Sequence, residues 1–391
     1  MYNTKIGEFC ATHENWEELL ASEPYNIKIK KEDGFVIFNY NQLSSDFNNE
    51  IVRECRGIIF EEGNWQFPVC HAFDKFGNYG ESYVPDMDWS TVKVSAKIDG
   101  SIMKLWCHNN VWHLSTNGNI DAENAPVPDV RKDTFAQIFW EVVNAKLGNW
   151  QNKQEAIIDW FNTLDPAYTY IFELVSPYTR VVIPYKYADI YFLGARNNIT
   201  DQQFGCDTAS AMLMHMSIFS RPKLFSMQTL DEIINTANSL PWDEEGYVCY
   251  DKNFNRCKIK SPRYVLAHFA RNNNVITRKH LIDIILKGEM EEFLIYAADY
   301  KDQMMWTKQL MDEFIIFVDN CALVSRNLRK LDRREAAEVI KKFHKLVQPI
   351  MFMNLDRHVG GRAYTYDWDA NKWERALDNF TRFLERGPEN R

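Results

Sequence analysis

The sequence lacks long hydrophobic runs. No stretch approaches roughly 18 uninterrupted apolar residues, and the N-terminal segment does not place an apolar stretch behind a basic one, so we expect neither a membrane-spanning helix nor a secretion signal. The 8 cysteines contain no C-x-x-C pair and no spacing typical of a disulfide framework. We therefore expect reduced thiols and a cytoplasmic protein.

Several chemical signatures are also missing. The chain has no Walker A string, no H-E-x-x-H, no Rossmann glycine pattern and no G-x-S-x-G. These absences disfavour P-loop NTPases, zinc proteases, dinucleotide-binding enzymes and α/β-hydrolases. His108 and His113 imitate a metal-binding pair by their spacing, but we interpret them as polar residues at strand ends.

The composition is that of an ordinary globular protein. The chain has 391 residues, of which 46% are hydrophobic and 14% aromatic, and a net charge of -9. That charge is unevenly divided, because residues 1–264 carry 24 Lys+Arg against 35 Asp+Glu, whereas residues 265–391 carry 21 against 19. The net charges are thus -11 and +2, and a polyanionic partner is expected to contact the second part.

Residues 1–264 predict an antiparallel α+β domain. Short β-branched or aromatic runs alternate with turns, and helical segments interrupt them at 134–146, 154–163 and 230–239. The strand candidates begin at Gly34, Arg56, Val92, Ser101, Val111, Thr169, Arg180, Ala188, Glu245 and Arg256. Such an order differs from a βαβ repeat and favours the α+β class.

Residues 265–391 predict an all-helical domain. Leu310, Phe314, Phe317, Val318 and Cys321 form one apolar stripe, and residues 336–347 carry a second. Asn272, Asn273 and Asn274 are a candidate linker, Gly360 and Gly361 mark a turn, and Pro388 marks a frayed end.

The string K-I-D-G at residues 97–100 is the most informative short motif. It lies between two strand candidates, so one interpretation is a β-hairpin whose turn is Asp99-Gly100. The other is a nucleophilic lysine, since K-x-D-G also marks enzymes that form a covalent lysine–nucleotide bond. The string alone leaves both open.

Five further strings have the order found in the covalent nucleotidyltransferases, the superfamily of ATP-dependent ligases and capping enzymes. E-C-R-G-I-I-F at 54–60 and D-K-F at 74–76 come before the lysine; F-E-L-V at 172–175, E-G-Y-V at 245–248 and K-I-K at 258–260 follow it. Within that superfamily the chain resembles the bacteriophage RNA ligase 1 family over nearly its whole length. Helices follow the K-I-K strand, where capping enzymes and DNA ligases normally continue into an oligonucleotide-binding barrel.

The resemblance implies a function and a set of site residues. It implies an ATP-dependent RNA ligase that repairs broken tRNA as a monomer in the cytoplasm, that of the host if the chain is of phage origin, and that needs Mg²⁺ or alternatively Mn²⁺. Lys97 is then the nucleophile that forms lysyl-AMP. The other implied site residues are Tyr40, Arg56, Lys75, Glu173, Glu245, Lys258 and Lys260 around the nucleotide, Glu173 and Glu291 at metal ions, and Tyr264 in ligation.

The chemistry accounts for the cluster of cations. A lysine with an unperturbed pKa near about 10.4 is almost entirely protonated at neutral pH and cannot attack a phosphorus atom. Lys258, Lys260 and a divalent metal near Lys97 would disfavour its charged form and also neutralise charge on the phosphate. The chain departs from the family at Asn117, which stands where the family has a lysine. The difference matters because an amide carries no charge.

Plain structural interpretations remain for several of these residues. A K-x-K strand can simply protect a sheet edge, isolated glutamates usually face solvent, Tyr40 can pack across strands, Tyr264 can lie at a domain seam, and Glu291 can belong to a surface pair with Glu292. Eight basic residues between Arg326 and Lys345, against three acidic ones, together with Trp368 and Trp373, predict an RNA contact or a solvated helix face.

Two other functions also stay open. A DNA ligase or a guanylyltransferase would use the same motifs on a different substrate. An RNA-binding protein could keep the fold without catalysis, although the intact Lys97, Glu173, Glu245, Lys258 and Lys260 argue against that.

Overall fold

The computed structural model describes residues 3–127, 133–148, 152–208, 211–270, 276–356 and 359–385. The chain divides into two compact units, Met1–His268 and Phe269–Arg391. Each unit is described by itself. The predicted linker Asn272–Asn274 and the predicted frayed end at Pro388 lie outside the described residues.

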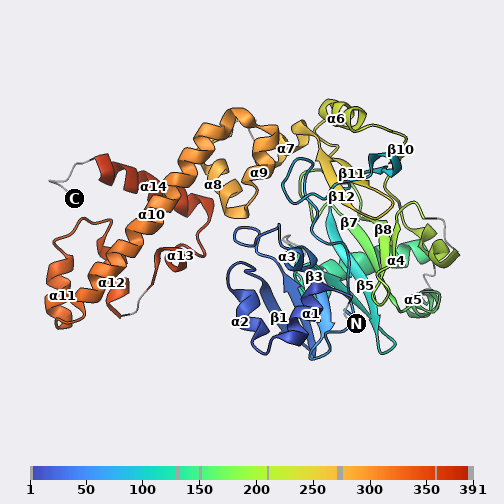
Figure 1. Cartoon of the computed structure of the whole chain (residues 1–391), viewed down its shortest axis with the longest axis horizontal. Coiled ribbons are helices and arrows are strands. Elements are labelled where there is room, and N and C mark those ends of the chain that lie inside the picture. The colour runs from blue at the N-terminus through green and yellow to red at the C-terminus, as the bar shows by residue number, and fades with distance from the viewer. Residues whose placement is uncertain are drawn as a thin grey trace. The chain divides into compact units, whose positions relative to one another are not determined.

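Three antiparallel sheets form the framework of the first unit (Figure 1). The first has the order β1 (Lys28–Glu32), β2 (Phe35–Asn39), β3 (Arg56–Glu61). The second has the order β10 (Leu224–Phe225), β4 (Lys93–Ala96), β11 (Gly246–Tyr250), β12 (Arg256–Lys260). The third has the order β6 (Val111–Thr116), β5 (Ser101–His108), β7 (Tyr168–Val175), β8 (Asp189–Asn197), β9 (Gln203–Gly205). The predicted α+β class is confirmed.

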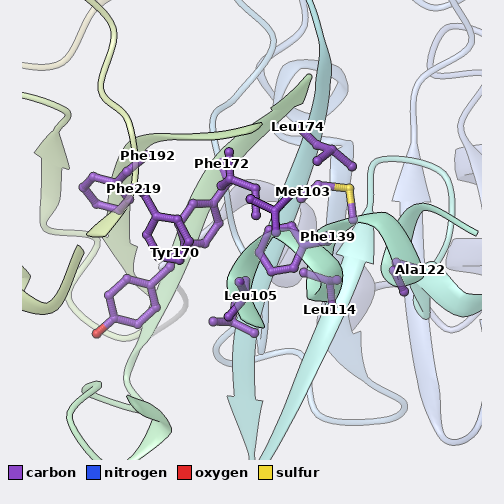
Figure 2. Packing of buried hydrophobic residues seen from close by; sticks show 14 of the residues in the cluster. Met103, Leu105, Leu114, Ala122, Phe139, Tyr170, Phe172, Leu174, Phe192 and Phe219 are labelled. Carbon is purple, nitrogen blue, oxygen red and sulfur yellow. The ribbon is translucent and has the colours of Figure 1, made fainter. Parts of the chain in front are cut away.

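The main core lies on one face of the five-stranded sheet. Because side chains alternate along a strand, Met103 and Leu105 of β5 both point to this face, where they meet Phe139 of a helix and Phe172 of β7 (Figure 2). All eight residues of β7 are buried. The central strand is thus covered on both faces, which explains why its sequence is mostly apolar, with Thr169 and a single acid, Glu173, as the exceptions.

Helices surround the sheets of the first unit. They are α1 (Lys5–Thr12), α2 (Trp16–Ala21), α3 (Glu50–Glu54), α4 (Phe135–Leu147), α5 (Lys153–Phe161), α6 (Leu230–Ser239) and α7 (Pro262–Ala270). A capping box between Thr134 and Gln137 starts α4, and Gly148 in the left-handed conformation ends it. The three predicted helices are confirmed as α4, α5 and α6.

The described elements of the second unit are all helical. They are α8 (Arg278–Lys287), α9 (Met290–Tyr296), α10 (Lys301–Leu328), α11 (Arg333–Ile340), α12 (Gln348–Asp356), α13 (Gly361–Tyr364) and α14 (Ala370–Glu385). Short 3₁₀ helices complete the two units at Trp89–Thr91, Ala122–Asn124, Ala211–Ile218 and Ala298–Tyr300. Within the described residues, none of the helices combines the length and apolar character needed to cross a bilayer.

The apolar stripe of α10 forms the centre of the second core. Phe314 and Val318 pack there with Trp373 and Phe380 of α14. Trp373 is only 2% exposed, so its predicted role as a stacking plane for RNA is wrong. The second predicted stripe is also broken, because α11 ends at Ile340 and the chain turns before α12 begins.

Candidate functional site

A pocket of about 650 Å³ opens in the first unit, a volume typical of small-ligand sites. All three sheets contribute to its wall, as do the segments that follow their strands. Seven of the residues expected at a nucleotide site line it: Tyr40, Arg56, Lys75, Lys97, Glu173, Lys258 and Lys260. Residues separated by more than 200 positions in the chain are thus brought to one cavity.

Lys97 comes directly after β4 and faces the end of β11. Its backbone N–H donates to the Gly246 carbonyl at 2.8 Å, and its Nζ donates to Glu245 Oε2 at 2.8 Å. Lys260 Nζ lies 3.5 Å from the other oxygen of Glu245. The two lysines therefore share one carboxylate, which is 4% exposed.

Burial alone would raise the pKa of Glu245. The nearby ammonium groups of Lys97, Lys260 and Lys258 outweigh burial and hold that pKa below its ordinary value. Glu245 is therefore ionised at neutral pH. The Lys97 amine donates a hydrogen bond to this carboxylate, and an amine must be unprotonated to act as a nucleophile.

Two glycines permit the close approach of these segments. Gly246 has φ +132, and a Cβ there would lie 2.3 Å from the carbonyl oxygen of Ile259. A Cβ on Gly100 would lie 2.5 Å from the carbonyl oxygen of Leu174 and 2.9 Å from Glu173 Cγ. Since real Cβ atoms do not approach so closely, both positions of the K-I-D-G and E-G-Y-V strings require glycine.

Asp99 does not form a hairpin turn. The strands on its two sides, β4 and β5, belong to different sheets, so the hairpin interpretation of K-I-D-G is wrong. The buried Asp99 carboxylate accepts hydrogen bonds from the N–H groups of Val182 and Ile183 at 2.9 and 2.7 Å. It also accepts one from the Tyr264 hydroxyl at 2.9 Å. Asp99 thus ties the pocket loop to two distant segments.

The strand predicted to begin at Arg180 is absent. The structure has no regular element between β7 and β8, over residues 176–188. Part of its backbone hydrogen-bonding capacity is spent on Asp99, because Val182 and Ile183 donate to that carboxylate and not to a neighbouring strand. The apolar pattern does correspond to burial, since Val182 is buried, but the segment is a loop and not a strand.

Glu173 of β7 lines the pocket, whereas Glu245 is not among the lining residues. The Glu173 side chain is 8% exposed. Burial raises its pKa to about 7, the cations of Lys97 and Arg56 lower it, and the carboxylates of Glu245 and Asp99 raise it. A carboxyl group held in this way would gain from a divalent cation beside it. The cations of Lys97 and Arg56 do not fully offset the free-energy cost that burial adds to ionising Glu173.

The remaining wall combines aromatic rings with cations. Lys75 Nζ lies 5.0 Å from the ring centre of Tyr40 and 4.8 Å from that of Phe47. The Arg56 guanidinium lies 5.1 Å from the ring centre of Phe76. Arg56 Nε is buried and has no hydrogen-bond partner among the described residues. Flat rings, several cations and an unsatisfied donor suit a planar base attached to phosphates.

A metal ion would fit this donor set in one particular way. Among the described residues, no cluster of three or more His, Cys, Asp or Glu side chains is positioned to hold a metal ion. Mg²⁺ is usually held by one or two carboxylates together with substrate phosphates and water. Glu173 fits that arrangement, and the phosphates would have to supply other ligands.

Glu291 is not among the residues that line the pocket. It is exposed in α9 of the second unit, and its predicted metal-binding role stays a prediction. Asn117 does line the pocket. His113 stacks on Trp106 with ring centres 4.3 Å apart, and His108 lies 3.4 Å from Glu61, so both histidines are accounted for by packing and pairing.

Two basic residues at or behind the pocket wall were not among the predicted site residues. Arg256 lines the pocket, lies 4.4 Å from the ring centre of Phe73, and has a pKa lowered to about 10 by burial first of all. The period of two in R-C-K-I-K could have revealed it, since Arg256 shares a face with Lys258 and Lys260. Lys104 is fully buried in β5; a lysine within the apolar run S-I-M-K-L-W-C was the available signal.

Comparison with known proteins identifies the family. A family model described as RNA ligase matches residues 54–264, which contain nearly all of the pocket. The chain belongs to the phage RNA ligase 1 family. This match confirms the family resemblance that the sequence motifs predicted.

Two relatives of this chain come from viruses. A protein of Autographa californica nuclear polyhedrosis virus, described as a bifunctional polynucleotide kinase/RNA ligase, is 31% identical over 286 residues, which are 70% of this chain and 39% of that protein. The chain thus spans about two fifths of this relative. An RNA ligase of Rhodothermus phage RM378 is 24% identical over 73% of this chain and 74% of its own length.

Solved structures with some likeness to the chain are also RNA ligases. An archaeal ATP-dependent RNA ligase has a TM-score of 0.43 and 12% identity over 74% of this chain and 73% of its own. An RNA ligase of Naegleria gruberi, solved with ATP and Mn, has a TM-score of 0.34 and 12% identity over 46% of this chain and 52% of its own.

Proposed function

We propose that the protein is an ATP-dependent RNA ligase that joins an RNA 5′-phosphate to a 3′-hydroxyl. The observation that carries this proposal is the pair of Lys97 and buried Glu245, because Lys97 lines a pocket of about 650 Å³ together with five further cations. Three nucleotidyl transfers are needed. AMP passes to the enzyme, then to the RNA 5′-phosphate, and is released when the 3′-hydroxyl attacks.

In the first transfer, Lys97 Nζ attacks the α-phosphorus of ATP. A P–N bond forms, the bond to the β-phosphate oxygen breaks, and pyrophosphate leaves. A proton must leave the Lys97 amine, and Glu245, which accepts its hydrogen bond at 2.8 Å, would take it. Lys258 and Lys260, on the wall of the same pocket, are placed to neutralise charge on the phosphates.

Glu173 would hold a divalent metal, Mg²⁺ or Mn²⁺, that neutralises developing phosphate charge. Tyr40, Arg56 and Lys75 would hold the nucleotide, because they form the aromatic and cationic wall. Glu291 is proposed to take part in a second metal site. Tyr264 would act in ligation by holding Asp99, two residues from the nucleophile.

The RNA substrate is proposed to be a broken tRNA, with residues 265–391 as the part that selects it. The basic residues between Arg326 and Lys345 support this assignment, because exposed cations attract phosphates. The protein would act as a monomer in the cytoplasm, that of the host if it comes from a phage.

The test is transfer of label from ATP labelled on the α-phosphate. We expect the protein to become covalently labelled through a bond that is acid-labile and alkali-stable, as a phosphoramidate is. It should then join a 5′-phosphorylated RNA to a 3′-hydroxyl end. GTP and nicked DNA, offered in parallel, separate this activity from guanylyl transfer and DNA ligation. RNA binding without any AMP transfer would refute the proposal.

A further inference from the structure

Lys104 is a lysine with no exposed surface, placed in the centre of β5. Its neighbours Met103 and Leu105 point into the main core (Figure 2). Alternation along the strand therefore directs Lys104 to the opposite face, together with Ile102, which lines the pocket. Lys104 is the next residue along this face, one step beyond the pocket lining.

The Lys104 amine lies directly behind the pocket wall. Gly57 follows Arg56 at a register shift between β2 and β3 and has φ +74. A Cβ on Gly57 would lie 2.7 Å from Lys104 Nζ and 2.7 Å from the Asn117 carbonyl oxygen. The amine is thus enclosed by the backbone of Gly57 and Asn117, next to two residues that line the pocket, Arg56 and Asn117.

Structural needs explain Lys104 poorly. Its Nζ donates to the Gly57 carbonyl, its single hydrogen-bond partner among the described residues, whereas an ammonium has three donors. Burial lowers the pKa of Lys104, Cys70 raises it, and the Arg56 cation lowers it further. A buried amine with one neutral partner leaves donors unsatisfied, which costs stability, and no described carboxylate pairs with it.

We propose that Lys104 is a positioning residue for the phosphates of the bound nucleotide. Its hydrogen bond to the Gly57 carbonyl fixes the backbone that carries Arg56, and so holds the Arg56 side chain at the pocket wall. This inference rests on the proposed function.

The test measures the dissociation constants of ATP and of adenosine for the full-length protein. The variants are Lys104→Met, which is similar in volume, and the double variant Lys104→Met with Asn117→Lys, which returns a charge to the same wall. Lys252→Met is the control, because it removes an exposed charge that is paired with Asp88. We expect Lys104→Met to weaken ATP binding about tenfold, with adenosine unchanged.

The double variant should recover most of the affinity for ATP, and the control should bind both ligands as the wild type does. If Lys104 only supported the fold, ATP and adenosine would weaken in parallel and Asn117→Lys would not rescue. Either result overturns the inference alone. Wild-type protein that binds no ATP overturns the proposed function and the inference with it.

Discussion

The two units of the molecule use their positive charge in opposite ways. The first unit is the acidic one, yet Lys97, Lys258 and Lys260 meet there around a single buried carboxylate, Glu245. The second unit holds eight basic residues between Arg326 and Lys345, but they do not share one helix face, since α10 ends at Leu328 and α11 covers only Arg333–Ile340.

The partners of these cations differ as well. In the second unit, Arg329 donates to the Asn354 carbonyl at 2.8 Å, and Lys341 pairs with exposed Glu338 at 2.7 Å. The exposed Lys341–Glu338 pair contributes little to stability. The comparison teaches that net charge says where phosphate is attracted in general, whereas chemistry on phosphate depends on cations that converge on one point.

The largest effect is expected from removal of the nucleophile in the first unit. Lys97→Ala should abolish covalent labelling by ATP, because it removes the amine that would form the bond to phosphorus. Joining of an RNA that already carries AMP on its 5′-phosphate should continue, since that step needs no lysine nucleophile. Lys252→Ala, which removes an exposed lysine, is the control. Labelling that persists in Lys97→Ala would refute the assignment.

The ion pair itself gives the next largest effect. Glu245→Gln should lower the free energy of unfolding by about 2 kcal/mol at neutral pH, because a charged hydrogen bond is lost. Since the folded pKa of Glu245 is depressed, its stabilisation is present above the ordinary carboxyl pKa and is lost as pH falls through the depressed value. The difference between variant and wild type should therefore shrink on acidification.

Denaturant unfolding from neutral to acidic pH measures this difference. Glu338→Gln is the matched control in the second unit, because it breaks an exposed pair with Lys341. A change as large for Glu338→Gln as for Glu245→Gln would erase the distinction between the two units.

The link between Asp99 and Tyr264 gives a smaller effect. Tyr264→Phe removes the hydroxyl that donates to Asp99 at 2.9 Å but keeps the buried ring. Ligation should slow about tenfold, the size expected from one hydrogen bond to a charged group. Single-turnover rates of joining measure this. Unchanged rates would show that the hydroxyl supports only the fold.

The smallest effect is expected in the second unit. Arg334→Glu with Lys342→Glu should weaken tRNA joining severalfold and reduce its dependence on salt, because both residues are exposed. Covalent labelling by ATP should not change. Arg329→Met is the contrasting variant, since Arg329 caps the Asn354 carbonyl and its loss should lower stability more than RNA affinity. If the wild type, the double variant and Arg329→Met join tRNA equally well, the basic residues between Arg326 and Lys345 do not contact the RNA.

The sequence predicted the fold class and most of the pocket for physical reasons. Strands and helices of strong periodicity, such as α4 and β7, reveal which face is buried. The prediction was wrong where one sequence pattern fits two structures. The apolar run after Arg180 fits a strand but is a loop that hydrogen-bonds to Asp99, and Trp373 fits an exposed stacking surface but lies in a core. Lys104 escaped notice because its meaning depends on Gly57, which is distant in the chain.

Gly246 has a consequence for how such a site can change over time. It carries no functional group, yet its backbone has φ +132 and a Cβ there would meet Ile259. Substitutions at Gly246 should therefore be tolerated as poorly as those at the nucleophile. The route by which this pocket could drift toward another nucleotide is limited by its backbone geometry as much as by its reactive side chains.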